Sequence, residues 1–445
     1  MIHAGIDIRA VQTQLVLTSE RSVLGGIAVP TTEDSTTGAV AALRKLLTKT
    51  GIAPSEIGAV MIGTAAFEEA VALRGGLSQV AAVRLCLPAS AALPPMADWP
   101  ADLSASVGGH WYLTHGGHEM DGRRISALSE PELTRIAADI RARQIGAVAI
   151  SAIFPPHDGG DAAAATAILS RELPGVRFAQ AGNAGTQGLL AREGTAILNL
   201  GLRDLAQRLL GQFALTLADA GIIGPLFLAR GDGTLMDAAS AVRQPVQTFG
   251  SGAANAIGGA GWLYRQTDAV VIELDQWRLT AGVLHNGLPR QGYGPARISG
   301  LRLSAPHPDL LALPLIEPPD TQMLTDIAAR LGAENLPVIL VGKDAGRVAA
   351  PAHPARRGAK PGFCALARAI GAAVAPVSGR VDRCYPLSQF SFEAAHADAR
   401  KRASQAAMAA GARPDSVAIH GLTEQALPGS VLRLQVLALG QPDVG

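Results

Sequence analysis

The sequence predicts an α/β protein with two related halves around a cleft and a C-terminal α+β segment. Apolar strands alternate with amphipathic helices, as where the strand Ala147 to Ile153 precedes the helix Asp161 to Leu173. A strand–turn–strand unit opens the chain between Ala4 and Leu17, and a second one lies between Ala269 and Leu284. Because this unit occurs once in each half, we interpret the chain as a coarse duplication whose halves enclose a cleft.

Composition favours a compact globular protein. The chain has 445 residues, enough for two or three domains, and 48% of them are hydrophobic. Only 17% are charged, below the usual share of about 25%. The formal net charge of +1 gives no field that would attract nucleic acid or an anionic membrane. We therefore expect neither of these partners.

Targeting and redox signals point to the cytoplasm. The three cysteines, Cys86, Cys364 and Cys384, are widely spaced and form no CxxC pair, which favours reduced thiols. The N-terminus has no basic region and no small-residue cleavage site, so no signal peptide is expected. There is no uninterrupted apolar run of about 18 residues, so no membrane span is expected.

The elements of the first half follow from residue periodicity. The helix Thr37 to Thr50 places Ala39, Val40, Leu43, Leu46 and Leu47 on one face, and Gly51 ends it. Ser90 to Trp111 is rich in proline, alanine and serine and is expected to be a loop. The other predicted elements are the strands Ala4 to Ile8, Gln14 to Leu17, Val23 to Val29 and Ile57 to Ile62, and the helices Ala65 to Leu73 and Pro131 to Gln144.

In the second half, the pattern predicts a long helix from Thr195 to Leu217 and a Gly/Ala-rich helix from Ser251 to Tyr264. Gln291 to Pro319 is proline-rich and expected to be irregular. The remaining predicted elements are the helices Asp320 to Leu331, Gly362 to Val377 and Ser391 to Ala410, and strands at Pro225 to Ala229, Val338 to Val341, Val381, Val417 and Val431 to Leu439. We divide the chain into residues 1–190, 191–377 and 378–445.

The central strand–turn–strand resembles a phosphate-binding loop of an actin-like ATPase. Such a turn uses glycines so that backbone N–H groups can approach phosphate oxygens without a Cβ between them. Here the turn reads Asp275-Gln276-Trp277-Arg278, which places an acid and an indole where phosphate oxygens would lie.

Several segments, in order, resemble A-type proteins of the hydantoinase/oxoprolinase family. They include GIDIRAVQTQLVL, GAVMIGTA, AVAISAIFPPHD, LLAREGTAILNLGL, LFLARGDGTLMDAASAVRQPVQTFGSGAANAIGGA and LPGSVLRLQV. The resemblance covers nearly the whole chain, which is similar to the shorter members of that family.

This resemblance implies an actin-like ATPase (ribonuclease H-like) fold with ATP and Mg²⁺ as cofactors. It also implies ATP-dependent hydrolysis of cyclic amides such as hydantoin, 5-oxoproline or a lactam, or activation of a ketone for carboxylation. Chemistry of this kind depends on positioning the phosphates and neutralising their charge. The resemblance further implies a separate B-type subunit as partner.

The expected nucleotide contacts depart from the family pattern Asp-x-Gly-Gly-Thr-x-Thr-Asp. Asp7 and Thr13 are kept, but Arg9-Ala10-Val11 replaces Gly-Gly-Thr. In the second loop Glu273 stands at the first Asp, and in the third loop Lys343-Asp344 follows Gly342. The candidate catalytic residues are Asp7, Glu273 and Asp275. The candidate nucleotide- or anion-binding residues are Arg9, Thr13, Asp232, Gly233, Ser251, Gly252, Arg278 and Gly342.

Each candidate has a structural alternative. Asp7 could order a Mg²⁺-bound water or cap the turn at the end of its strand. Arg9 and Arg278 could hold an anion between the halves, or form an interdomain salt bridge with Asp275 or Glu273.

The stretch HWYLTHGGHEMD contains the one cluster with metal-like spacing, His110, His115, His118 and Asp121. It is either a metal site or a surface loop.

Three functional hypotheses follow. The first is a divergent A-type subunit with altered phosphate loops and weak or lost ATPase activity, which acts as a partner or regulatory subunit or as a pseudoenzyme. The second is a hydrolase with an altered site for an acidic small molecule. The third is a non-enzymatic sensor of a small ligand. A homo-oligomer is compatible with all three.

Overall fold

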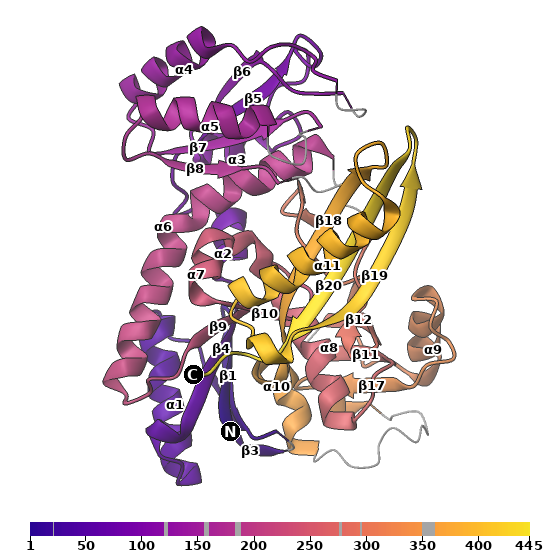
Figure 1. Ribbon diagram of the computed structural model, residues 1–445. Helices are drawn as coiled ribbons and strands as arrows, with labels where there is room; N and C mark the ends of the chain where they lie inside the picture. Colours follow the sequence, from indigo (N-terminus) through magenta and orange to yellow (C-terminus); the bar gives the residue numbers. More distant parts are fainter. Residues whose placement is uncertain are drawn as a thin grey trace.

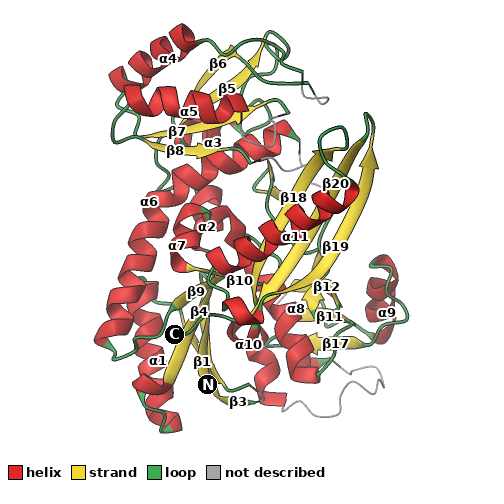
Figure 2. Ribbon diagram, viewed as in Figure 1, coloured by secondary structure: helices red, strands yellow, loops and turns green. Residues whose placement is uncertain are grey.

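A computed structural model describes residues 1–20, 22–119, 123–154, 160–182, 188–275, 278–293, 296–348 and 361–445. Within these ranges, a nine-stranded sheet has the order β19-β20-β18-β10-β9-β4-β1-β2-β3. Two smaller sheets, one four-stranded and one five-stranded, are built from the segments inserted between its strands. Helices flank the sheets (Figure 2).

The N-terminal part of the large sheet is an antiparallel meander that continues into parallel strands. β1 (Ile2–Ile8), β2 (Gln12–Thr18) and β3 (Val23–Pro30) are antiparallel neighbours, whereas β4 (Ile57–Thr64) and β9 (Leu226–Ala229) add in parallel. α1 (Ser35–Thr50) buries the five predicted apolar positions. Its N-terminus is capped by the Asp34 side chain, and Gly51 ends it in the left-handed region at φ 71°.

A parallel sheet is inserted between β4 and β9. It has the order β6-β5-β7-β8 and consists of β5 (Ala81–Leu87), β6 (His110–His115), β7 (Ala147–Ala152) and β8 (Arg177–Gln180). The helices α3 (Ala101–Ser106), α4 (Glu130–Ala142) and α5 (Gly160–Glu172) lie in this inserted segment, whereas the preceding helix α2 (Ala66–Ala72) packs in the core of the large sheet. The long helix α6 (Leu189–Asp219) runs from the inserted sheet down to α1 (Figure 1).

The predicted loop Ser90 to Trp111 is wrong in its second part, because α3 and the beginning of β6 lie there. Its prolines lie before the helix, and Pro100 is the residue at the N-cap of α3. Proline is compatible with a helix start because the missing N–H would have no partner there.

The second smaller sheet contains the central hairpin. β11 (Ala269–Asp275) pairs with β12 (Arg278–His285) and in parallel with β17 (Val338–Val341). β13 (Leu288–Pro289) and β16 (Leu310–Pro314) also pair with β12, and α9 (Thr321–Arg330) packs on this sheet. The expectation of irregular structure for Gln291 to Pro319 is wrong, because β16 and the hairpin of β14 (Ala296–Ile298) and β15 (Leu301–Leu303) lie there.

Two helices fill the space between the large sheet and the hairpin sheet. α10 (Ala367–Val374) packs on β1, β2 and β4, while α8 (Ser251–Tyr264) packs on β11 and β12 and against α10. Their backbones approach so closely that a Cβ on Gly259 would lie 1.9 Å from the Ala367 carbonyl oxygen. A Cβ on Gly371 would lie equally close to the Asn255 carbonyl oxygen. Glycine is therefore a packing requirement at this crossing.

The C-terminal part extends the large sheet. β18 (Val377–Pro386), β19 (Ala418–Leu427) and β20 (Val431–Gly440) form an antiparallel ribbon that joins the sheet where β18 pairs in parallel with β10 (Leu235–Asp237). α11 (Phe392–Ala409) lies on this ribbon (Figure 1), and α7 (Ala238–Arg243) follows β10.

The division at 190/191 and 377/378 stays a prediction, although strands from all three segments share the large sheet. The predicted helix Gly362 to Val377 is too long, because Pro361–Leu366 forms a 3-10 helix and β18 begins at Val377. Among the described helices, none combines the length and the apolar character that crossing a bilayer requires.

Candidate functional site

Asp7 lies at the end of β1, where the sequence predicts a catalytic carboxylate. Its side chain is 1% exposed, and its Oδ2 accepts a hydrogen bond from Arg9 Nε at 3.0 Å. The β1–β2 turn is closed by the Arg9 N–H, which donates to the Gln12 carbonyl, and by Thr31 Oγ1, which donates to the Arg9 carbonyl at 2.7 Å. Thr13 supports the turn through a 2.9 Å contact between its Oγ1 and Thr31 Oγ1.

The Arg9 guanidinium lies against the first turn of α8. A Cβ on Gly252 would lie only 1.1 Å from Arg9 Nη2. Glycine at this position therefore makes room for a side chain of the same protein. The structure thus brings the two candidates Arg9 and Gly252 together, and the neighbouring Ser251 is buried.

A carboxylate also reaches the N-terminus of α8. The Gly250 N–H donates to Glu68 Oε1, so α2 supplies an anion at the helix end that the sequence predicts as an anion site. Burial raises the pKa of Glu68, while the Gly250 N–H and Arg9 oppose that shift. The helix end is therefore already surrounded by a carboxylate and a guanidinium from within the chain.

Three buried polar atoms converge near Gly63. A Cβ on Gly63 would lie 2.7 Å from Asp7 Oδ1 and 2.8 Å from Asn255 Nδ2. Asp7 Oδ1, Asn255 Nδ2 and Asn255 Oδ1 are buried and have no hydrogen-bond partner within the described residues. Buried polar groups are rarely left unsatisfied, so such a cluster indicates a place for a water or a ligand.

Glu273 on β11 is held by a residue that the sequence analysis does not single out. Arg368 on α10 forms a two-pronged ion pair with it, Nε to Oε1 at 2.5 Å and Nη2 to Oε2 at 2.7 Å. Burial by itself would lower the pKa of Arg368. Glu273, with additional contributions from Asp7 and Asp275, outweighs burial and raises that pKa. All three candidate catalytic carboxylates therefore act electrostatically on Arg368.

The predicted salt-bridge alternative is wrong in its partners. Arg9 pairs with Asp7, and Glu273 pairs with Arg368. Asp275 and Arg278 are exposed and lie opposite each other at the open end of the β11–β12 ladder. Gln276 and Trp277 lie outside the described residues.

Gly342, after β17, has a structural reason to be glycine. Its φ is +99°, and a Cβ there would lie 2.3 Å from the Leu274 carbonyl oxygen. Gly233 likewise has φ +79°, and a Cβ there would meet the Pro289 ring at 2.6 Å. Both glycines permit contacts within the protein.

Asp232 belongs to a different group of charges. Its carboxylate accepts from the Thr234 N–H at 3.1 Å and pairs with Arg380 Nη2 at 3.5 Å. Burial would raise the pKa of Asp232, but Arg230 and Arg380 lower it.

The histidine cluster is divided between different contacts. His115 Nδ1 lies 2.7 Å from Glu132 Oε1. His118 is buried, and its backbone forms an isolated β-bridge with Arg124. His110 begins β6, and Asp121 lies outside the described residues. In the described part of the chain, no three His, Cys, Asp or Glu side chains are grouped closely enough to hold a metal ion.

Three residues of the candidate site escape sequence reasoning. Glu68 stands in an ordinary helical Glu-Glu pair, whereas Asn255 stands between alanines in the small-residue part of α8 and Arg368 is the single polar residue of α10. A lone polar residue in an otherwise apolar helix is the signal that could have identified the last two.

Comparisons with known proteins show what this chain resembles in sequence and in fold. Residues 3–173 match the hydantoinase/oxoprolinase N-terminal region. Over this region, which is less than half of the chain, the sequence is similar to the hydantoinase/oxoprolinase family. Comparison with curated proteins gave no match.

Two solved structures share the fold of this chain. An ATP-dependent caprolactamase from Pseudomonas jessenii is 13% identical with a TM-score of 0.73. A nucleotide-free acetone carboxylase, from work on ATP-dependent acetone carboxylation, is 12% identical with a TM-score of 0.68. In both comparisons, 99% of this chain and 88% of the other chain are covered. The predicted actin-like α/β fold is thereby confirmed.

Proposed function

We propose that this chain is an A-type subunit of the hydantoinase/oxoprolinase family with weak or lost ATP-driven opening of cyclic amides, and that it acts as a partner or regulatory subunit. The observation that carries this proposal is the position of Arg9. Its guanidinium packs on Gly252 at the N-terminus of α8 and pairs with the buried Asp7 carboxylate.

The residues around the cleft do not fit a magnesium triphosphate. A triphosphate needs open backbone N–H groups and carboxylates that are free to hold the metal. Here Glu68 accepts the Gly250 N–H, Arg9 engages Asp7, and Arg368 engages Glu273. Each missing donor at such a site typically costs about 2–4 kcal/mol of transition-state stabilisation. Several losses together would leave little nucleotide-driven catalysis.

Calorimetry with MgATP and MgADP tests the proposal. We expect no saturable heat that corresponds to a Kd below about 1 mM, equivalent to about 4 kcal/mol of binding free energy. Micromolar binding accompanied by phosphate release would contradict the proposal.

A restored first loop provides the matched comparison. The triple substitution Arg9→Gly, Ala10→Gly and Val11→Thr returns this loop to the family pattern. It removes the guanidinium from α8 and opens the turn, so we expect the affinity for MgATP to rise at least about tenfold, or 1.4 kcal/mol. An unchanged affinity would mean that these side chains do not exclude the nucleotide.

The partner role is tested by mixing the purified chain with a B-type subunit. We expect a stable complex in gel filtration. We also expect this chain to change the activity of that subunit without ATP, and the triple variant to have the same effect. Separate elution with unchanged activity would argue against a partner or regulatory role.

A second candidate function is a hydrolase with an altered site for an acidic small molecule. The unpartnered Asp7 Oδ1 and Asn255 amide at Gly63 favour it, because a carboxylate there could orient a water. 5-Oxoproline is a suitable probe, assayed with and without ATP. This candidate predicts turnover that Asp7→Ala abolishes, and an equal rate in both proteins would remove Asp7 from the mechanism.

A further inference from the structure

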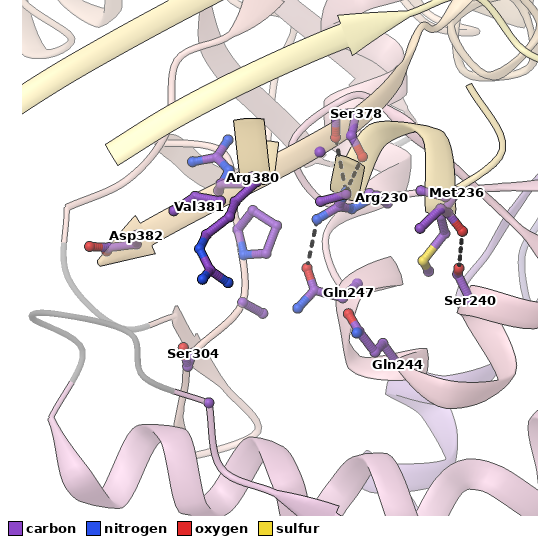
Figure 3. A pocket seen from close by; sticks show the side chains of 18 of the residues that line it. Arg230, Met236, Ser240, Gln244, Gln247, Ser304, Ser378, Arg380, Val381 and Asp382 are labelled. Atoms are coloured by element: carbon purple, nitrogen blue, oxygen red, sulfur yellow. Dashed lines mark hydrogen bonds between the residues drawn. The ribbon is translucent and has the colours of Figure 1, made fainter. Parts of the chain in front are cut away.

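A cavity of about 820 Å³ lies away from the phosphate loops. Its walls come from the segment that follows β9, from α7, β18 and α11, and from parts of α5, β8 and the segment after β15. Figure 3 shows Arg230, Arg380 and Ser304 around this cavity. The described residues that line it include five arginines and one acid, namely Arg230, Arg243, Arg380, Arg383, Arg402 and Asp382. The cavity is therefore strongly basic in a protein whose net charge is close to zero.

Part of this charge is neutralised within the C-terminal ribbon. Asp382 accepts two hydrogen bonds from Arg433, at 2.7 and 2.5 Å, and one from Gln435 at 2.9 Å. Arg383 and Arg402 both pair with Asp398, at 3.7 and 2.7 Å. The charges of Asp382, Arg383 and Arg402 are therefore paired within the ribbon and α11. The charges of Arg230, Arg243 and Arg380 remain to be explained.

Arg230 is a buried cation that is held by neutral groups. It is 9% exposed, and its Nη1 donates to the Ser378 carbonyl and hydroxyl oxygens while its Nη2 donates to Gln247 Oε1 at 3.0 Å. The hydrogen bonds found for its guanidinium among the described residues go to these neutral groups, and Asp232 is the acid that acts on it electrostatically. Figure 3 shows Ser378 and Gln247 fixing the orientation of this side chain. These neutral acceptors fix the position of the Arg230 guanidinium but do not neutralise its charge.

The other two arginines add to this surplus. Arg380 lies 3.5 Å from Asp232, the nearest acid, and its side chain is 35% exposed. Arg243 is exposed and donates to Ser240 Oγ at 2.9 Å. Among the described residues, Arg230 and Arg380 thus both act on the single carboxylate of Asp232, and Arg243 adds a third positive charge to the cavity wall. Burying positive charge without a partner is costly, so an external anion would be bound favourably.

We propose that this cavity binds a small molecule with several anionic oxygens, either phosphate or carboxylate groups, and that Arg230 and Arg380 hold one such group between them. Guanidinium groups recognise both kinds of group through paired N–H donors. The cavity lies in the range of about 300–1,000 Å³ that is typical of small-molecule pockets, so it has room for more than one anionic group. This ligand would bind whether or not the central cleft takes a nucleotide.

Thermal unfolding and calorimetry with two probes, inorganic phosphate and citrate, test this proposal against sodium chloride at the same ionic strength. We expect phosphate, citrate or both to raise Tm by mass action, while chloride does not. A response to phosphate alone assigns a phosphorylated ligand, and a response to citrate alone assigns a polycarboxylate. The proposal fails if neither probe stabilises the protein more than chloride does.

Matched variants locate the binding. Arg380→Gln and Arg243→Gln each remove one exposed guanidinium from the cavity, and each is expected to weaken binding about tenfold or more. Arg135→Gln makes the same charge change on the exposed face of α4 and is expected to leave binding unchanged. Equal affinities of Arg380→Gln, Arg243→Gln and Arg135→Gln would overturn the assignment, because the anion would then bind elsewhere.

Discussion

Replacing Arg84 with methionine is expected to lower the free energy of unfolding by about 3–5 kcal/mol. Arg84 is fully buried in β5, and its Nε and Nη2 donate to the two Glu193 carboxylate oxygens at 2.8 and 2.6 Å. Glu193 lies on α6 and also accepts a hydrogen bond from Ser151 Oγ. Removing the arginine would therefore leave a buried carboxylate without its counter-charge, where β5, β7 and α6 meet.

Urea unfolding of Arg84→Met measures this effect. The double variant Arg84→Met with Glu193→Leu should regain much of the loss, because no unpaired charge remains in the core. Arg171→Met is the control, since Arg171 and Glu130 are both more than half exposed and such pairs are worth less than about 1 kcal/mol. If Arg84→Met costs no more than Arg171→Met, the buried pair does not stabilise the inserted sheet.

Replacing Gly259 with alanine is expected to destabilise the protein by about 3 kcal/mol, at the upper end of overpacking costs. The new methyl group would lie 1.9 Å from the Ala367 carbonyl oxygen and 2.8 Å from the Gly371 nitrogen. Both neighbours are backbone atoms of α10, so α8 and α10 would have to move apart. That movement would reach the cleft, because α8 carries Gly252 and α10 carries Arg368.

The preceding residue offers a matched control in the same helix. A Cβ on Gly258 would meet nothing within 4 Å, so Gly258→Ala should raise the free energy of unfolding by up to about 1 kcal/mol through helix propensity. Both variants are compared by urea unfolding and by the melting temperature. Equal effects of the two substitutions would show that α8 and α10 are not in close backbone contact.

The two candidate sites differ in how their charges are balanced. In the central cleft, Asp7 and Glu273 are each paired with an arginine of the same chain. In the basic cavity, Arg230 is held by a hydroxyl, a carbonyl and an amide, and it keeps its charge available. The first arrangement satisfies the charges within the chain, whereas the second favours an external anion. Ligand binding is therefore expected at the cavity more than at the phosphate loops.

The sequence by itself determined the elements whose signals are local. Residue periodicity and caps predict α1 and α8 to within about two residues. The motif order predicts the family, and the replacement of Gly-Gly-Thr by Arg9-Ala10-Val11 predicts a changed first loop. These signals are carried by neighbouring residues, which is why they can be interpreted without the fold.

Only the tertiary structure decided which charges meet. In β5, Arg84 interrupts an apolar run, so the hydrophobic pattern does not reveal the strand. The carboxylate that neutralises Arg84, that of Glu193, lies 109 residues away along the chain. Arg368 reaches Glu273 across 95 residues, and Arg230 reaches Ser378 across 148. The sheet topology and the crossing of α8 and α10 bring these partners together. Local sequence patterns do not indicate such distant contacts. The ion pairs at Asp7 and Glu273 and the basic cavity are therefore visible only in the folded chain.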